Sequence, residues 1–214
     1  MPGIDAVLKS PAHVIWFGEL HGTTETPAFF GDAVCAAAKD GRKVIVALER
    51  SKMDDGVLAA FLDTPEHDTA TSILLTGREW RNRGQDGRSS LAMLSLMGRL
   101  RDDKASGVIA DIVLIDDWRD TEGSDAAMAK TVKAALTKSP DARLLVYSGN
   151  FHAMKTAPQG THTAASQLPA DDVYAVNIQI EGGTAWSLEK GVVAVPGFPH
   201  RAAGIFRAAD TGLP

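Results

Sequence analysis

The stretch Val14-Ile-Trp-Phe-Gly-Glu-Leu-His-Gly-Thr-Thr-Glu-Thr-Pro27 decides the fold class that this sequence predicts. It starts as a buried apolar strand, and a glycine-flanked turn then carries Glu19, His21 and Glu25. Glycine permits a sharp turn and the close approach of a ligand to the backbone. A strand, a tight turn and a helix in this order present polar side chains at the carboxyl edge of an α/β sheet, where ligands usually bind. The stretch alone predicts either a site or an ordinary solvated loop, and the rest of the chain decides between them.

Apolar runs of strand length alternate with helical patterns along the chain. The first helix is expected to begin at Pro27 with Thr26 as its cap, because proline at the first helical position loses no hydrogen bond. The alternation predicts a single α/β domain over residues 1–214, with a mainly parallel central sheet flanked by helices and antiparallel edge strands near the C-terminus. The expected strands are His13–Phe17, Lys43–Glu49, Asp111–Asp116, Arg143–Tyr147, Val173–Ile180 and an edge strand at Ala185–Leu188.

Residues from about 63 to 88 form an irregular excursion from this pattern. They combine Pro65 and several glycines with charged side chains around Trp80. A charged segment of this length is typical of a lid or binding loop, in which Trp80 would contact a substrate. The alternative is a solvated excursion with Trp80 packed underneath. The sequence leaves both interpretations open.

The composition excludes several classes of protein. A net charge of −5 without a basic run argues against nucleic acid as a partner. The single cysteine, Cys35, excludes an internal disulfide and a CxxC motif. No segment reaches the roughly 20 apolar residues of a membrane span, and residues 1–10 lack the apolar core of a signal peptide. We therefore expect no transmembrane segment, and a cytoplasmic protein unless a signal peptide has been removed.

Polar side chains follow each of the first four expected strands. Right-handed crossovers place the carboxyl ends of parallel strands at one edge of the sheet, so these side chains are expected to converge. Two of the turns share the form Gly-x-x-His, beginning at Gly18 and Gly149. This repetition favours a convergent site over scattered surface residues. The side chains are Glu19, His21 and Glu25, then Glu49 and Arg50, then Asp116 and Asp117, and finally Asn150 and His152.

Two chemistries suit this set of residues. Two histidines with several carboxylates form a mixed N/O set that fits Zn, Mn or Fe, and a metal-bound water is a nucleophile near neutral pH. Without a metal, a buried glutamate beside a histidine activates water as a general base. The candidate metal ligands are His21, Glu25, Glu49, His152 and Asp116.

Substrate contacts are expected from neighbouring basic and polar residues. Arg50 or Arg88 would hold a substrate carboxylate or a transition-state oxyanion, and Asn150 lies at the same expected edge. The sequence has no G-x-S-x-G elbow, no P-loop and no G-x-G-x-x-G pattern. These absences argue against a serine nucleophile of that kind and against a nucleotide cofactor.

The order of these motifs resembles the superfamily that joins erythromycin esterases, ChaN-type haem-binding proteins and Tiki/TraB proteins. The likeness covers about Val14 to His152, and it is closest to small ChaN-like bacterial proteins. The residues that carry it are Gly18-Glu-x-His21-Gly followed by Glu25, Ala47-Leu-Glu49, Trp80, Asp86-Gly-Arg-Ser-Ser90 and Gly149-Asn-x-His152.

The implications of this resemblance differ among its branches. Erythromycin esterases use a histidine and glutamates to activate water on a lactone, which implies such roles for His21, Glu19, Glu49 and His152. Tiki-like members are similar to metal-dependent peptidases, with matching positions at His21, His152 and Glu49. ChaN-like members bind haem, sometimes as dimers that sandwich it, and are often exported. The resemblance thus also implies haem as an alternative ligand, a homodimer, and a periplasmic location.

The leading prediction is a hydrolase of ester, lactone or amide bonds that acts on a small-molecule substrate. His21 and Glu19 would lie at the reacting centre, with Glu49 and His152 completing it, either around a divalent metal or without one. The predicted substrate-binding residues are Arg50, Arg88, Trp80 and Asn150. The alternative is an uptake protein that binds haem or metal without catalysis, and a third hypothesis is an inert relative.

Overall fold

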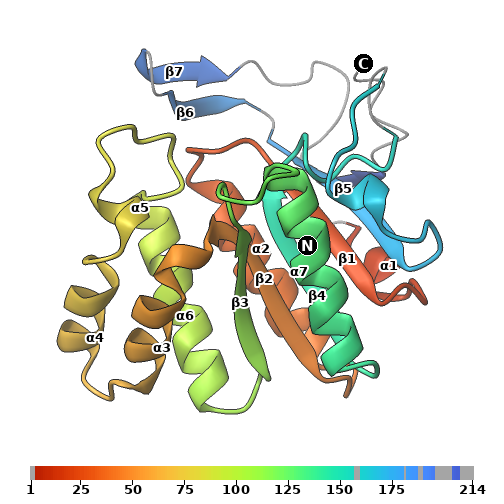
Figure 1. Ribbon diagram of the computed structural model, residues 1–214, viewed down its shortest axis with the longest axis horizontal. Coiled ribbons are helices and arrows are strands. Elements are labelled where there is room, and N and C mark those ends of the chain that lie inside the picture. Colours follow the sequence, from red (N-terminus) through yellow and green to blue (C-terminus); the bar gives the residue numbers. More distant parts are fainter. Residues whose placement is uncertain (1–2, 157–159, 181, 188–189, 196–203, 208–214) are drawn as a thin grey trace.

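The computed structural model describes residues 3–156, 160–180, 182–187, 190–195 and 204–207, and Figure 1 shows their arrangement. The strands are β1 (Val14–Glu19), β2 (Val44–Ser51), β3 (Asp111–Asp116), β4 (Arg143–Gly149), β5 (Val173–Gln179), β6 (Gly183–Ser187), β7 (Gly191–Val195) and β8 (Gly204–Arg207). The helices are α1 (Ile4–Leu8), α2 (Glu25–Ala38), α3 (Asp55–Asp63), α4 (His67–Leu74), α5 (Arg78–Arg81), α6 (Leu91–Ala105) and α7 (Ser124–Lys138), with 3-10 turns η1 (Lys52–Asp54) and η2 (Ala165–Gln167).

The central sheet has the strand order β3-β2-β4-β1-β5-β8. The first five strands in this order run parallel, and β8 pairs antiparallel with β5. The predicted α/β fold with a mainly parallel sheet and antiparallel strands near the C-terminus is therefore confirmed. Since the crossovers between parallel strands return the chain to the same end, the carboxyl ends of β1, β2, β3 and β4 meet at one edge.

Side chains alternate between the two faces of the sheet, and both faces are covered. Ile15 and Phe17 pack into a core with residues of α2, α3, α4 and α6. Val14 and Trp16 pack on the opposite face with residues of α7 and η2. In Figure 1, α7 crosses in front of the sheet. Burial on both faces explains why β1 reads as a continuous apolar run rather than as alternating apolar and polar residues.

The start of α2 corrects one prediction. The helix begins at Glu25, and Thr24 rather than Thr26 occupies the N-cap position. Thr26 lies inside the first turn, where its buried hydroxyl donates a hydrogen bond to Glu19 Oε2 at 3.0 Å. The cap prediction was wrong because Thr26 lies inside the helix, and its hydroxyl is hydrogen-bonded to Glu19 at the end of β1 instead of capping α2.

The segment expected to be an irregular excursion contains α4 and α5. The carboxylate of Asp54 accepts hydrogen bonds from the backbone N–H groups of Arg78 (2.8 Å) and Glu79 (3.3 Å) at the start of α5. Residues 82–90 then form the loop between α5 and α6. The excursion is thus partly helical, and Asp54 fixes the start of α5 within it.

The strand expected at Ala185–Leu188 does not join the central sheet. β6 pairs antiparallel with β7, and the resulting hairpin lies across the carboxyl edge of the sheet (Figure 1). Leu188 lies outside the described residues. The hairpin therefore covers the place where the sequence predicts a site.

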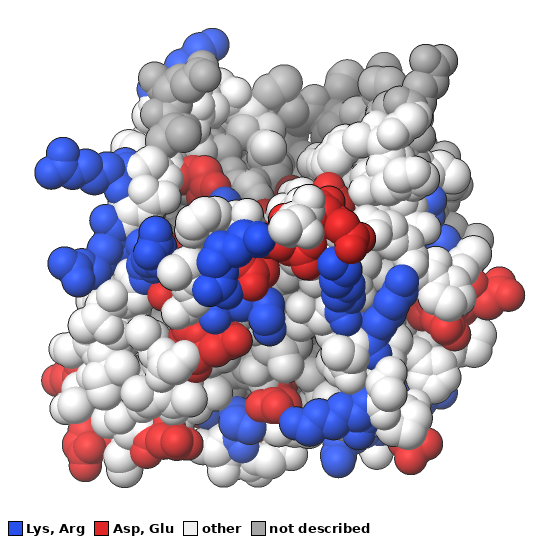
Figure 2. All heavy atoms as spheres, viewed as in Figure 1, with Lys and Arg blue, Asp and Glu red and all other residues white. Residues whose placement is uncertain are grey.

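Basic and acidic side chains are interspersed on the face drawn in Figure 2. Within the described residues, no helix has both the length and the apolar character that crossing a membrane requires.

Candidate active site

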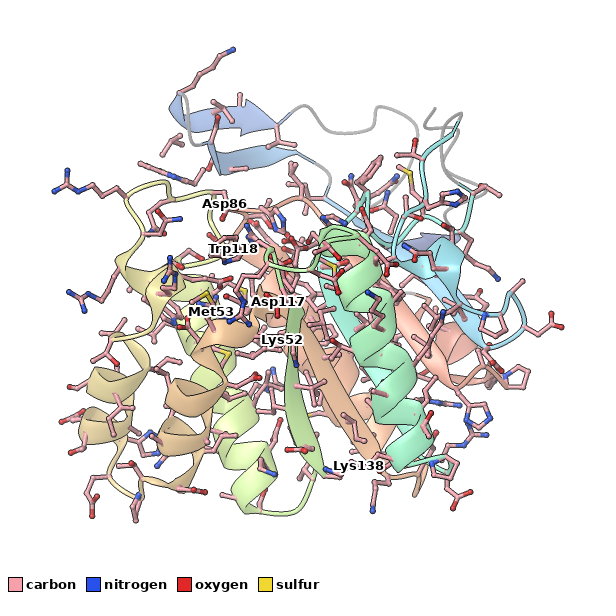
Figure 3. All side chains as sticks on the ribbon, in the orientation of Figure 1. Lys52, Met53, Asp86, Asp117, Trp118 and Lys138 are labelled. Atoms are coloured by element: carbon pink, nitrogen blue, oxygen red, sulfur yellow. The ribbon has the colours of Figure 1, made fainter. Side chains whose placement is uncertain are left out.

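A pocket of about 450 Å³ opens at the carboxyl edge of the sheet, between the ends of β1 and β4 and the β6–β7 hairpin. Its polar wall comes from the two Gly-x-x-His turns and from the loop between α5 and α6. Asp86 of this loop lies below the hairpin in Figure 3. The lining residues are Glu19, Leu20, His21, Asp86, Gly149, Asn150, Phe151, His152, Ala185, Trp186, Ser187, Val193 and Val195.

The first histidine of the pocket is oriented by a glutamate. Glu19 is the last residue of β1 and is 4% exposed, and its Oε1 is hydrogen-bonded to His21 Nδ1. Glu19 Oε2 accepts the hydroxyl of Thr26, which lies 3.0 Å from the hydroxyl of Tyr147. These contacts fix the carboxylate, so the imidazole of His21 has a set orientation with Nε2 left for other contacts.

The second histidine, His152, is also hydrogen-bonded to a carboxylate, which comes from α7. His152 Nδ1 lies 2.8 Å from Asp125 Oδ1, and Asp125 belongs to the first turn of α7. The same oxygen accepts the backbone N–H of Ala164 at 2.6 Å, which fixes this carboxylate in turn. The pocket thus contains two carboxylate–histidine pairs, Glu19–His21 and Asp125–His152.

Glu49 joins the two pairs. Its Oε2 lies 3.7 Å from His21 Nε2, and its Oε1 lies 3.7 Å from His152 Nε2. Oε2 also accepts the backbone N–H of Gly149 at 2.6 Å, and Oε1 accepts Arg88 Nη1 at 2.8 Å. A distance of 3.7 Å is longer than a normal hydrogen bond, so each Nε2 is near Glu49 and still able to reach another atom.

These contacts shift the pKa values of all three groups. Burial disfavours the charged form of His21, but its contacts with Glu19 and Glu49 outweigh burial and raise its pKa from 6.5 to about 10. Burial would also raise the pKa of Glu49, but His21 first, and then Arg88 and His152, lower it from 4.5 to about 2. The pKa of His152 is raised despite burial, because Asp125 and Glu49 favour its charged form. At neutral pH the site therefore holds an anionic Glu49 beside a protonated His21.

Arg88 is brought to the site, but its guanidinium is already occupied. It contacts Asp86 at 2.7 Å, Glu49 at 2.8 Å and Asp116 at 3.9 Å. Burial would lower the pKa of Arg88, but Asp86 first, and then Glu49 and Glu79, raise it above its ordinary value. The contacts position Glu49 and leave Arg88 little capacity to hold a substrate carboxylate, which was one of its expected roles.

Arg50 and Trp80 do not line the pocket. The pairing of β2 with β3 is irregular between Leu48 and Ser51. Glu49 contacts the pocket histidines, whereas Arg50 contacts Trp80 and Glu79. Arg50 is 3% exposed, lies 4.6 Å above the Trp80 ring and 3.2 Å from Glu79, and donates to the carbonyl of Arg88 at 2.5 Å. Arg50 is hydrogen-bonded to the loop that carries Arg88, and Trp80 packs against Arg50. The predicted contact of these two residues with substrate is therefore not seen.

Of the other predicted site residues, some line the pocket and others lie outside it. Asn150 lines the pocket, and its backbone N–H donates to the carbonyl of Glu19 at 2.9 Å. Asp116 lies behind Arg88 and accepts the hydroxyl of Ser124 at 2.5 Å. Glu25 is exposed in the first turn of α2 and does not line the pocket, and Asp117 pairs with Arg119 at the end of β3 (Figure 3).

Sequence reasoning missed three parts of the site. Asp125 and Asp86 were not singled out as site residues, although an acid in the first turn of a helix at the carboxyl edge of a sheet is a usable signal for Asp125. Thr26 was interpreted as a cap. The β6–β7 wall had no signal in the sequence, because its position depends on contacts with distant loops.

The predicted divalent metal would need several His, Asp or Glu side chains placed around one point. Within the described residues, no group of three or more His, Cys, Asp or Glu side chains is placed to hold a metal ion. One oxygen of Glu49 accepts a cationic guanidinium and the other a backbone N–H. The described residues therefore do not fit a metal in this arrangement, and the metal stays a prediction.

Comparison with known proteins shows the fold and no more. No protein-family model matches the chain, and a search of curated proteins finds no match either. A mutant of the erythromycin esterase EreC in its open conformation superposes with a TM-score of 0.63 at 12% identity, over 90% of this chain and 77% of that one. The type III effector HopBA1 gives a TM-score of 0.54 at 11% identity, over 91% of both chains.

A third solved structure is the C-terminal region of Pasteurella multocida toxin, described as having a thiol-protease-like catalytic triad. Its TM-score is 0.53 at 11% identity, over 93% of this chain and 26% of that one. These likenesses show that the chain shares its fold with these structures, an erythromycin esterase among them. The predicted closeness to ChaN-like and Tiki/TraB proteins is not addressed by them and stays a prediction.

Proposed function

We propose that this protein is a hydrolase that adds water to the carbonyl group of an ester, lactone or amide. The observation that carries the proposal is the pair of carboxylate-bound histidines whose Nε2 atoms lie 3.7 Å from the two oxygens of one buried glutamate. Two imidazoles beside one pocket suit a reaction that takes up one proton and delivers another. The esterase and the thiol-protease-like domain among the structural neighbours are consistent with a hydrolase.

The large pKa shift of His21 assigns the two proton-transfer roles. Because His21 is held protonated up to a pKa of about 10, it suits the general acid. Asp125 and Glu49 also raise the pKa of His152, and we assign it the role of general base, which it performs once it has lost its proton. Its Nε2 takes a proton from water as the water oxygen attacks the carbonyl carbon. His21 Nε2 then protonates the leaving oxygen or nitrogen, and the two products are a carboxylic acid and an alcohol or amine.

The remaining residues set the charge and geometry around this exchange. Glu49 keeps both imidazoles close to the pocket, and Arg88 and the Gly149 N–H hold Glu49 in place. Asn150 lines the pocket beside the two histidines and carries a side-chain amide. It is suited to donate a hydrogen bond to the oxyanion that forms during attack.

Metal-assisted hydrolysis and haem binding remain separate hypotheses. The proton transfers assigned to His152 and His21 require neither a metal nor haem. Elemental analysis of the protein purified without chelator, together with haem titration followed at the Soret band, tests both directly.

The proposal is tested by a screen of esters, lactones and anilides with wild type, His21→Ala, His152→Ala and Asp125→Asn. We expect wild type to hydrolyse at least one class, and each substitution to lower kcat by about 10²- to 10⁴-fold, the usual contribution of acid–base catalysis. His67→Ala is the matched control, because His67 is exposed and pairs with Asp102 away from the pocket. Hydrolysis that survives in both His21→Ala and His152→Ala would contradict the proposal.

A further inference from the structure

The wall of the pocket opposite the histidines is apolar and is formed by the β6–β7 hairpin. Side chains on a strand alternate between its faces, so Val193 and Val195 line the pocket while Val192 faces away and is 67% exposed. Ala185 lies directly across from Val193 in the hairpin and is buried. The hairpin thus presents a row of small aliphatic side chains to whatever occupies the pocket.

Large apolar side chains are also exposed around the same pocket. Leu20 is 44% exposed and Phe151 is 38% exposed, and both line it. Clustered exposed apolar residues of this kind mark binding sites, whereas single ones are common on any surface. Their position beside His21 and His152 indicates a ligand that covers them.

Among the described residues, each positive charge at this pocket is already paired with a carboxylate. The protonated His21 lies between Glu19 and Glu49, and His152 is paired with Asp125. None of the described lining residues is Lys or Arg. The guanidinium of Arg88 is paired with Asp86 and Glu49, and that of Arg50 is buried against Glu79 and Trp80. An anionic ligand would therefore lose its hydration and meet the carboxylates of Glu19, Glu49 and Asp86, while the charges of His21 and Arg88 are already paired with these acids.

We propose that the pocket binds a neutral apolar group, such as an aliphatic or aromatic acyl chain, and discriminates against groups that carry a carboxylate or phosphate. As a statement about substrate, this rests on the proposed hydrolase function. As a statement about the pocket, it concerns binding alone and can be tested without turnover.

The binding test uses two dyes that share one fluorophore. N-phenyl-1-naphthylamine is neutral, and 8-anilinonaphthalene-1-sulfonate carries an added sulfonate. We expect wild type to bind the neutral dye at least about tenfold more tightly than the anionic one, a free-energy difference of about 1.4 kcal/mol. Val193→Lys places a cation on the pocket face and should reverse or abolish this preference. Val195→Lys serves as a second variant if Val193→Lys fails to fold.

Val192→Lys is the matched control, because it adds the same charge to the same strand on the outer face. It should retain the dye preference of wild type. Equal binding of both dyes by wild type, no binding of the neutral dye, or the same response in Val192→Lys and Val193→Lys would overturn the inference.

A kinetic test separates the inference from the proposed function. 4-Nitrophenyl valerate and the 4-nitrophenyl monoester of glutaric acid differ in one end of the acyl chain, a methyl group in the first and a carboxylate in the second. We expect wild type to favour the valerate in kcat/KM, and Val193→Lys to narrow that difference. Hydrolysis that depends on His21 but favours the anionic ester would overturn only the inference. Absence of all hydrolysis would count against the proposed function, and the dye preference would still decide the inference.

Discussion

At the scale of single residues, the chemistry depends on how three carboxylates share two imidazoles. Glu19 and Asp125 each hold one Nδ1, and Glu49 lies near both Nε2 atoms. Each imidazole thus has one close carboxylate at Nδ1 and Glu49 at 3.7 Å from Nε2, and the two differ in their pKa, because the large shift, to about 10, belongs to His21. This asymmetry, rather than the identity of the two side chains, distinguishes the acid from the base.

The asymmetry predicts the pH dependence of hydrolysis. A base must be unprotonated and an acid protonated, so kcat/KM should rise as His152 loses its proton and fall as His21 loses its own. The rising limb is expected above the ordinary histidine pKa of 6.5, and the falling limb near 10. The measurement is kcat/KM against pH for the best ester found. A profile with a single rising limb near 10 would assign the base to His21 and contradict this role assignment.

At the scale of elements, much of the fold could be predicted because apolar runs define buried strands directly. The prediction placed the centres of β1, β2, β3 and β4 correctly, and right-handed crossovers then brought their ends to one edge. The same reasoning brought Glu19, His21, Glu49 and His152 together. It could not decide which way a side chain points at an irregular strand end, and so it placed Arg50 in the pocket beside Glu49.

The position of Arg50 predicts a loss of stability rather than a loss of substrate contact. Arg50→Met would leave Glu79, itself mostly buried, without its cation, and removing one partner of a buried ion pair typically costs about 3–5 kcal/mol of unfolding free energy. The measurement is urea denaturation of wild type and Arg50→Met. The exposed arginine of the Arg119–Asp117 pair supplies the control, and Arg119→Met should leave stability nearly unchanged. An Arg50→Met protein with wild-type stability and a raised KM would restore Arg50 as a substrate-binding residue.

At the scale of the whole molecule, the pocket is closed by segments that are far apart in the sequence. The backbone N–H of Trp186 donates to the carbonyl of Gly22 at 3.1 Å, and its indole N–H donates to the carbonyl of Gln85 at 2.6 Å. A Cβ on Gly22 would lie 2.6 Å from the carbonyl oxygen of Trp186, and one on Gly87 would lie 2.2 Å from Gly22. Glycine at these two positions permits the hairpin, the first turn and the α5–α6 loop to stack.

This stacking explains why part of the site could not be predicted from the sequence. Each segment gives a local signal for a turn or a strand, but the contact between Trp186 and Gly22 spans most of the chain and has no periodicity. The sequence indicated the polar residues delivered by the parallel strands, and it did not indicate the apolar wall that faces them. Fold class and catalytic candidates were accessible, whereas the substrate-facing surface required the three-dimensional arrangement.

The central claim is that the site activates water itself, and single-turnover hydrolysis in ¹⁸O-labelled water tests it most directly. With protein in excess over ester, mass spectrometry would follow the label in the acid product and in the carboxylates of Glu19 and Glu49. The account predicts that the acid formed in the first turnover carries ¹⁸O, that neither glutamate is labelled, and that His152→Ala abolishes this product. An unlabelled acid with ¹⁸O appearing in Glu19 or Glu49 would show attack by a protein carboxylate and contradict the account.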